Sequence, residues 1–161
     1  MSQSAALSDE TTGALKLDAY LPYRLSVASN AVSGLIARAY EDRFGLSIPQ
    51  WRLICVLAED GGKTQREIVA RTVMDKVTVS RAARELVARR LAARSSNKAD
   101  GRSHVLTLTR EGERMHAEIS PLALAYEAAL IAGLAPAEVA QLKRLLIRLQ
   151  GAAGALSGAE S

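Results

Sequence analysis

The sequence has very few of the residues that build disulfides, metal centres or covalent catalytic sites. Among its 161 residues there is one cysteine, Cys55, and two histidines, His104 and His116. One cysteine cannot form an internal disulfide, and although Glu113 and His116 have helical ligand spacing, two histidines are too few to indicate zinc. We therefore expect no metal and no cofactor. Cys55 lies between Ile54 and Val56, a context typical of a buried apolar side chain rather than an oxidant sensor.

Long apolar runs and enzyme motifs are also missing. No uncharged apolar segment approaches the about eighteen residues that cross a bilayer, and the first ten residues contain no lysine or arginine. We therefore expect a cytoplasmic protein without a membrane partner. The sequence contains no Gly-x-Ser-x-Gly, P-loop or Gly-x-Gly-x-x-Gly pattern, so we do not expect an enzyme.

The charge of the chain is unevenly distributed. Hydrophobic residues make up 48% and charged residues 24%, which is typical of a folded domain, and the net charge is +4. Residues 60–110 contain twelve Lys or Arg against five Asp or Glu, a net +7, whereas the rest of the chain carries −3. A segregated basic segment indicates contact with nucleic-acid phosphate, although such segments are often only solvated helix faces.

The apolar spacing predicts long helices at both ends of a mainly α fold. A helix is expected over 21–44, and Ser47, followed by Pro49 and Gln50, has the pattern that starts a second helix. Thr109 is expected to cap a helix kinked at Pro121, and a last helix follows Pro136. These long helices carry more apolar surface than a compact domain needs, which predicts a homodimer.

The basic segment has the pattern of a helix-turn-helix followed by a hairpin. Thr64 and Glu67 have capping-box spacing, and Asp75 is expected to cap a helix over 76–90. The inner face of that helix is Val79, Ala82, Ala83 and Leu86, and its outer face is Val77, Arg81, Arg84 and Ala88. Strand-like runs at 91–94 and 103–108, joined by a basic turn, predict a β-wing.

Two segments on this frame resemble a known family. Residues 74–81, MDKVTVSR, lie at the start of the predicted recognition helix, and residues 100–112, DGRSHVLTLTREG, carry Asp-x-Arg-Ser followed by Leu-Thr and Gly. From Leu21 to Leu149 the chain resembles the MarR (multiple antibiotic resistance regulator) family of winged helix-turn-helix transcription factors. The resemblance implies a homodimeric repressor that binds a pseudo-palindromic double-stranded DNA operator and that a small effector releases from it.

The resemblance places the DNA contacts on the recognition helix and the wing. Arg102 matches the arginine that enters the minor groove, and Asp100 matches the acid that orients it. The predicted DNA-binding residues are Lys76, Thr78, Ser80, Arg81, Arg84, Lys98, Asp100 and Arg102. The alternatives are a solvated helix end for Arg81, Arg84, Arg89 and Arg90, and an ordinary turn residue for Asp100.

Most of the aromatic side chains lie in one segment. Five of the six fall between residues 20 and 51, together with Arg24 and a polar stripe. In the family the effector often lies between the dimer helices and the DNA-binding lobe, so this segment resembles the lining of a pocket for a phenolic or other aromatic acid. The predicted ligand-binding residues are Tyr23, Arg24, Ser26, Asn30, Tyr40, Trp51 and His104. The alternatives are an aromatic core and, for His104, a half-exposed strand residue.

The predicted fold class is therefore mainly α with a small β-wing, a winged helix-turn-helix flanked by long dimerisation helices. The segments are a flexible arm (1–14), an N-terminal dimerisation helix (15–46), the DNA-binding lobe (47–110), C-terminal dimerisation helices (111–150) and a flexible tail (151–161). Two alternatives remain: an activator of the same fold, and a helical dimer that binds polyanions or proteins non-specifically. The sequence identifies neither the effector nor the operator.

Overall fold

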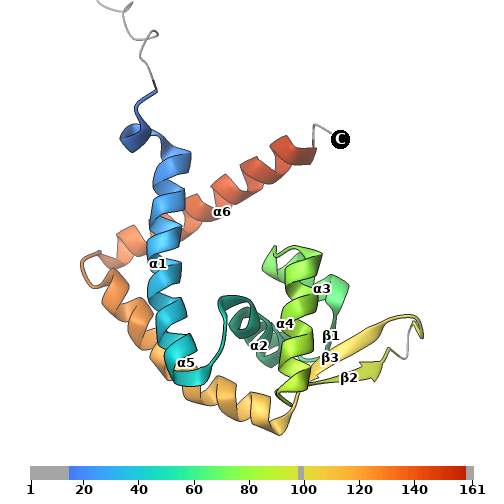
Figure 1. Cartoon of the computed structure of the whole chain (residues 1–161). Coiled ribbons are helices and arrows are strands. Elements are labelled where there is room, and N and C mark those ends of the chain that lie inside the picture. Colours follow the sequence, from blue (N-terminus) through green and yellow to red (C-terminus); the bar gives the residue numbers. More distant parts are fainter. Residues whose placement is uncertain (1–14, 98–99, 159–161) are drawn as a thin grey trace, which may run out of the picture.

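The structure, a computed structural model, describes residues 15–97 and 100–158. The helices are η1 (Leu17–Ala19), α1 (Leu21–Phe44), α2 (Ile48–Asp60), α3 (Gln65–Thr72), α4 (Lys76–Ala88), α5 (Arg110–Ile131) and α6 (Pro136–Gly158), and the strands are β1 (Lys63–Thr64), β2 (Ala92–Ser96) and β3 (His104–Leu108). Figure 1 shows α2, α3, α4 and the sheet gathered into a lobe on one side of α1. The mainly α architecture with a small β-wing is confirmed.

Side-chain caps fix where the central helices begin. Ser47 and Gln50 form a reciprocal capping box at α2, and Thr64 and Glu67 form another at α3. Thr109 caps α5 by accepting a hydrogen bond from the backbone N–H of Gly112 at 3.1 Å. Each cap satisfies backbone donors that the first turn of a helix leaves without partners. The starts predicted from these residues are therefore confirmed.

The wing is part of a three-stranded antiparallel sheet in the order β1-β3-β2. Strand β3 pairs with β2 from Ala92 opposite Leu108 to Ser96 opposite His104, and with the two residues of β1 on its other edge. The sequence analysis missed β1, because a strand of two residues is too short to show alternation. The second strand was expected at 91–94 and lies at 92–96.

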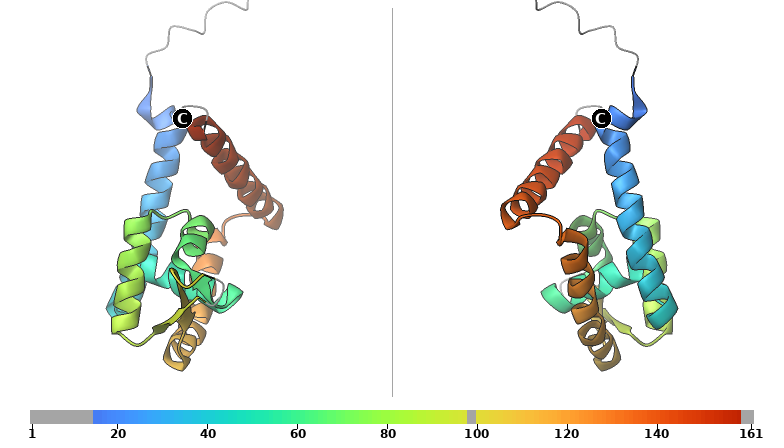
Figure 2. Two further views of the ribbon diagram at one scale, coloured as in Figure 1. Left: turned by 90° about the vertical axis from the view of Figure 1, so that its right-hand side faces the viewer. Right: turned by 90° about the vertical axis from the view of Figure 1, so that its left-hand side faces the viewer.

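The core lies inside the winged lobe and ends at the middle of α5. The side chains with the least exposure are Leu46, Leu53, Ile54, Ile68, Val79, Leu86 and Ile119. Among the described residues, α1 buries only Tyr40 and α6 buries none. Figure 2 shows α6 projecting away from the lobe, and many of its large apolar side chains are exposed in the single chain. The exposed large apolar residues of α5 and α6 include Leu124, Leu130, Leu142, Leu145, Leu146, Ile147 and Leu149.

Two expectations for the helices are corrected. The flexible tail predicted from residue 151 is helical as far as Gly158, because the alanines and Leu156 of this segment are strong helix formers. Helix α4 ends at Ala88 rather than at residue 90, since Arg90 adopts a left-handed φ of 60°. Helix α5, for which a kink at Pro121 was expected, is one helix from Arg110 to Ile131 with Pro121 inside it, and its ribbon bends along its length in Figure 1. The predicted arm at 1–14 lies outside the described residues.

Within the described ranges, no single helix is both long and apolar enough to cross a membrane. Helices α5 and α6 meet the length and composition criteria only as a pair, and they are bent by 105° relative to each other.

Candidate nucleic-acid interface and apolar cavity

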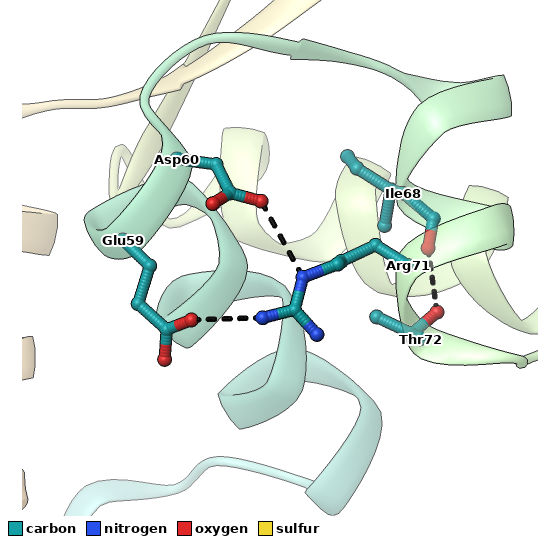
Figure 3. Close-up of polar contacts among 5 residues, drawn as sticks. All are labelled: Glu59, Asp60, Ile68, Arg71 and Thr72. Carbon is teal, nitrogen blue, oxygen red and sulfur yellow. Dashed lines mark hydrogen bonds and ion pairs between the residues drawn. The ribbon is translucent and has the colours of Figure 1, made fainter.

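Polar contacts hold α3 and α4 against α2. Arg71 of α3 contacts both acids at the end of α2, with its Nη2 3.1 Å from Glu59 Oε2 and its Nε 3.5 Å from Asp60 Oδ2 (Figure 3). Gln50 of α2 is only 6% exposed and donates from Nε2 to Glu85 Oε2 of α4 at 2.7 Å. The partly exposed arginine contacts are worth little energy, but together with the buried amide they fix how α3 and α4 are oriented.

The turn between α3 and α4 contains a strained residue. Val73 has a left-handed φ of 55°, and its backbone N–H donates to Val69 O at 3.0 Å to close α3. A β-branched residue is disfavoured in this region because its side chain crowds the backbone. Its side chain is 72% exposed, so burial does not offset the strain.

Asp75 organises the first turn of α4. Its Oδ1 accepts from the backbone N–H of Thr78 at 2.8 Å, and its Oδ2 accepts from the Thr78 hydroxyl at 2.6 Å. The hydrogen bonds from Thr78 lower the pKa of the Asp75 carboxyl. The Thr78 hydroxyl is therefore occupied as a donor, and it presents only its lone pairs to any other partner.

The outer face of α4 carries side chains that the protein leaves uncovered. Lys76, Val77, Arg81 and Arg84 are exposed, whereas Ser80 is half-buried. Val77, Arg81 and Arg84 follow one another at intervals of four and three residues and so share one face of the helix. The opposite face is the predicted set Val79, Ala82, Ala83 and Leu86, all buried. The predicted division of α4 into two faces is confirmed.

Arg89, expected as a solvated helix end, has a structural contact. Its Nη1 donates to the carbonyl of Gly45 at 2.6 Å and its Nη2 to the carbonyl of Phe44 at 2.9 Å. These carbonyls belong to the end of α1, where backbone acceptors have no partner within the helix. Arg89 thus joins the end of α4 to the end of α1.

The wing turn is held by its own backbone and by Asp100. Asn97 Nδ2 donates to Ser103 Oγ at 2.8 Å, and the backbone N–H of Ser103 donates to the carbonyl of Asp100 at 3.0 Å. Asp100 Oδ1 accepts from the backbone N–H of Arg102 at 3.1 Å. Across the described part of the wing, the Asp100 carboxylate makes no ion pair with the Arg102 guanidinium. In this structure Asp100 therefore shapes the turn through the Arg102 backbone, and its role in orienting the guanidinium on DNA stays a prediction. Lys98 lies outside the described residues.

A basic hollow separates the wing from α3. It encloses about 460 Å³ and is lined by Arg66, Arg94, Arg102 and His104, among other residues. His104 is exposed here, so the structure places it beside the predicted DNA contacts and not beside the other predicted ligand residues. Sequence analysis did not single out Arg66 of α3 and Arg94 of β2, because the two residues are distant in sequence and only the tertiary structure brings them to one hollow.

A second, more apolar cavity lies between α1, α2 and α5 and encloses about 400 Å³. Its lining is Val32, Ser33, Leu35, Ile36, Tyr40, Ile48, Trp51, Arg52, Ala123, Tyr126, Glu127 and Leu130. The predicted Tyr40 and Trp51 meet here, with ring centroids 5.4 Å apart. Tyr23, Arg24, Ser26 and Asn30 do not line it, because all four lie nearer the start of α1 than Val32, the first residue of the lining. The cation of the lining is Arg52, and the second tyrosine is Tyr126 of α5.

The polar groups of this cavity include a phenol, a guanidinium and the carboxyl group of Glu127. Burial raises the pKa of the Tyr40 phenol, with smaller contributions from Cys55 and Tyr126, so Tyr40 keeps its proton and can donate it in a hydrogen bond. Burial, reinforced by Glu59, raises the pKa of Cys55 to about 11. The His116 ring stacks on Trp51 at 5.6 Å, on the side of the core. The cavity therefore offers aromatic walls, a phenol donor, one guanidinium and one carboxyl group, Glu127, which accepts from Lys143 Nζ of α6 at 3.0 Å.

Comparison with known proteins identifies the family. Residues 44–103 match the MarR family pattern. A MarR family transcriptional regulator from Silicibacter pomeroyi DSS is 32% identical, with 83% of this chain and 89% of that chain covered and a TM-score of 0.73. No curated protein sequence matches the chain significantly.

Two further solved structures are similar and involve ligands. Bordetella bronchiseptica BpsR, whose DNA binding is regulated by 6-hydroxynicotinic acid, has a TM-score of 0.80 and 27% identity, with 86% of this chain and 98% of that chain covered. The PcaV transcriptional regulator of Streptomyces coelicolor, solved with its natural ligand, has a TM-score of 0.75 and 25% identity, with 88% and 99% covered. The winged fold, the sequence identity and the extent of the match together show that this chain belongs to the MarR family, whose members are transcriptional regulators and not enzymes.

Proposed function

We propose that this regulator is a homodimeric repressor that binds a pseudo-palindromic operator and that a small aromatic or phenolic acid releases from DNA. The observation that carries the proposal is the presence of two features in one chain. A basic face formed by α4 and the wing is exposed, and an apolar cavity with one guanidinium lies between α1, α2 and α5.

The basic face has the chemistry of a DNA contact. Arg81 and Arg84 project from α4, and Arg94 and Arg102 belong to the wing. In the winged helix arrangement, α4 enters the major groove and Arg102 the minor groove, whose negative potential attracts a guanidinium. Lys76, Ser80 and Lys98 complete the proposed contacts, while Asp100 shapes the turn that carries Arg102. Thr78 takes part as an acceptor because its proton is already donated to Asp75.

The uncovered apolar surface of α1, α5 and α6 supports the homodimer. Leucines at 142, 145, 146 and 149 follow helical spacing along α6 and are exposed in a single chain. Exposed apolar surface of this extent is unusual in a monomer and is typical of an interface with another copy. A dimer would present two α4 helices to successive major grooves about one helical turn apart. In this arrangement, 15–46 and 111–150 are the dimerisation segments and 47–110 is the DNA-binding lobe.

The cavity suits an aromatic acid. Tyr40, Trp51 and Tyr126 provide apolar contact with a ring, while Arg52 provides a partner for a carboxylate. 6-hydroxynicotinic acid, the effector of BpsR, is an acid of this kind. Arg52 therefore takes the role that the sequence analysis assigned to Arg24.

An occupant of the cavity would act on DNA binding through the long helices. The cavity wall includes α1, and Arg89 joins the end of α1 to the end of α4. A ligand that binds more tightly when the two α4 helices have a spacing other than that of the operator shifts the dimer to that spacing. The same coupling energy then lowers the affinity for the operator.

The DNA-binding part is tested by measuring, with fluorescence anisotropy, the affinity of the protein for the intergenic DNA next to its gene. Scrambled DNA of equal length is the control for selectivity. We expect selective binding that weakens steeply with salt. Arg102→Ala should weaken binding, whereas Arg114→Ala, which removes an equal charge from an exposed position on α5, should not. Equal losses in both variants, or equal affinity for both DNAs, would refute the assigned interface.

The effector part is tested by adding aromatic acids to the protein–operator complex. One acid should release the DNA, and Arg52→Ala should raise the concentration needed, because the carboxylate loses its partner. Arg24→Ala is the matched control, since it removes the same charge from α1 outside the cavity. An acid that works equally well on the Arg52 variant would contradict the cavity assignment.

A further inference from the structure

The first turn of α4 contains one apolar side chain that the described part of the chain leaves largely exposed. Val77 is the second residue of the helix and is 66% exposed. The two residues that follow it have partners inside the protein: the Thr78 hydroxyl donates to Asp75, and the Val79 side chain is fully buried. Val77 is thus the exposed aliphatic side chain at the N-terminal end of α4, and a recognition helix contacts base edges with its N-terminal residues.

Valine at position 77 contributes little to the stability of the free protein. A β-branched residue loses rotamer freedom in a helix and is a poorer helix former than alanine or lysine. An exposed valine does not recover this cost through burial, because water still surrounds most of its surface. The packing of the free lobe gives no reason for valine here.

The major groove offers a partner of matching chemistry. The edges of the bases carry hydrogen-bond donors and acceptors, and the C5-methyl group of thymine is the apolar exception. Arg81 and Arg84 lie on the same face of α4 as Val77, one and two turns further along. If the arginines reach into the groove, as the proposed function requires, Val77 enters it with them.

We propose that Val77 is a specificity-determining residue that packs against the C5-methyl group of one thymine in each half of the operator. The inference rests on the proposed DNA-binding function and adds to it a base preference: an apolar contact selects thymine over cytosine and over uracil at one position. Arg81 and Arg84 would supply charge and hydrogen bonds beside it.

The test replaces the thymines of a footprinted operator, one symmetric pair at a time, with deoxyuridine, which lacks only the methyl group. Burial of one methyl group is worth about 0.8 kcal/mol, or about fourfold in affinity per half-site. We expect one pair of positions to weaken binding of the unmodified protein by about this factor per half-site. Val77→Ala should bind the thymine and uracil operators equally.

Arg81→Ala is the matched control on the same face of α4. It should weaken binding to both operators and keep the difference between thymine and uracil. The proposal is overturned if no thymine pair is sensitive, or if the Val77 variant retains the sensitivity. Failure to prefer operator over scrambled DNA would instead refute the proposed function, and the inference with it. Circular dichroism and the urea midpoint show whether each variant is folded.

Discussion

Replacing Gly112 with alanine should strongly destabilise the winged lobe. An added Cβ would lie 2.1 Å from the carbonyl oxygen of Leu91 and 3.0 Å from Leu108 Cδ2, whereas Cβ contacts under 3.0 Å are essentially never seen. The start of α5 would have to move by about 1 Å, and the hydrogen bond from the backbone N–H of Thr109 to the same Leu91 oxygen, 3.1 Å long, would be stretched. Overpacking costs about 1–3 kcal/mol and a lost hydrogen bond about 1 kcal/mol, so we expect a loss of about 3 kcal/mol.

Urea unfolding followed by circular dichroism measures this loss at one fixed protein concentration, because the stability of a dimer depends on concentration. A loss of this size corresponds to a melting temperature lower by about 6–12 °C for a chain of this length. Gly133→Ala is the matched control, since no atom lies within 4 Å of the Cβ it would add. A Gly112 variant with the midpoint of the unmodified protein would refute the reasoning, and would show that α5 can shift freely against the wing.

The structure also predicts the direction of three further effects, on stability, on its pH dependence and on thiol reactivity. Val73→Gly should raise the free energy of unfolding by about 1 kcal/mol in urea titrations, because glycine adopts the left-handed conformation without strain; a lower midpoint would contradict this. The lowered pKa of Asp75 means that its carboxylate stabilises the fold above the ordinary value of 3.8 and that this stability is lost as the pH falls through the folded pKa. Between pH 5 and pH 3 the unmodified protein should therefore lose more stability than Asp75→Asn, and equal losses would refute the cap. Cys55, with a pKa of about 11, should resist iodoacetamide at pH 8 until the protein is unfolded, and rapid labelling of the native protein would show that the thiol is accessible and ionised.

The parts of the fold that could be predicted from sequence depend on neighbours close along the chain. Ser47, Thr64, Asp75 and Thr109 cap helices through contacts three residues away, so the spacing of residue types is enough to find them. The two faces of α4 were also predictable, because helical periodicity alone separates the buried Val79 from the exposed residues.

The parts that could not be predicted depend on how distant segments meet. Arg24 and Arg52 look equally suitable beside aromatic residues, and only the packing of α5 against α2 decides that Arg52 lines the cavity with Tyr126. Arg89 looks like one of several surface arginines, yet it binds carbonyls more than forty residues earlier in the chain. No local pattern carries that information, since both contacts follow from tertiary structure.

The order of the strands leaves β2 at the edge of the sheet, where its outer backbone groups are open to pairing with another strand. Such edges favour aggregation, and proteins commonly protect them with short strands and charges. Strand β2 is five residues long and carries Arg94, and Arg102 lies on the adjoining turn, so two wings that approach edge to edge bring like charges together. We therefore expect the arginines proposed to bind DNA also to disfavour pairing between the wings of separate molecules. Substitutions that neutralise them should lower colloidal solubility as well as operator affinity.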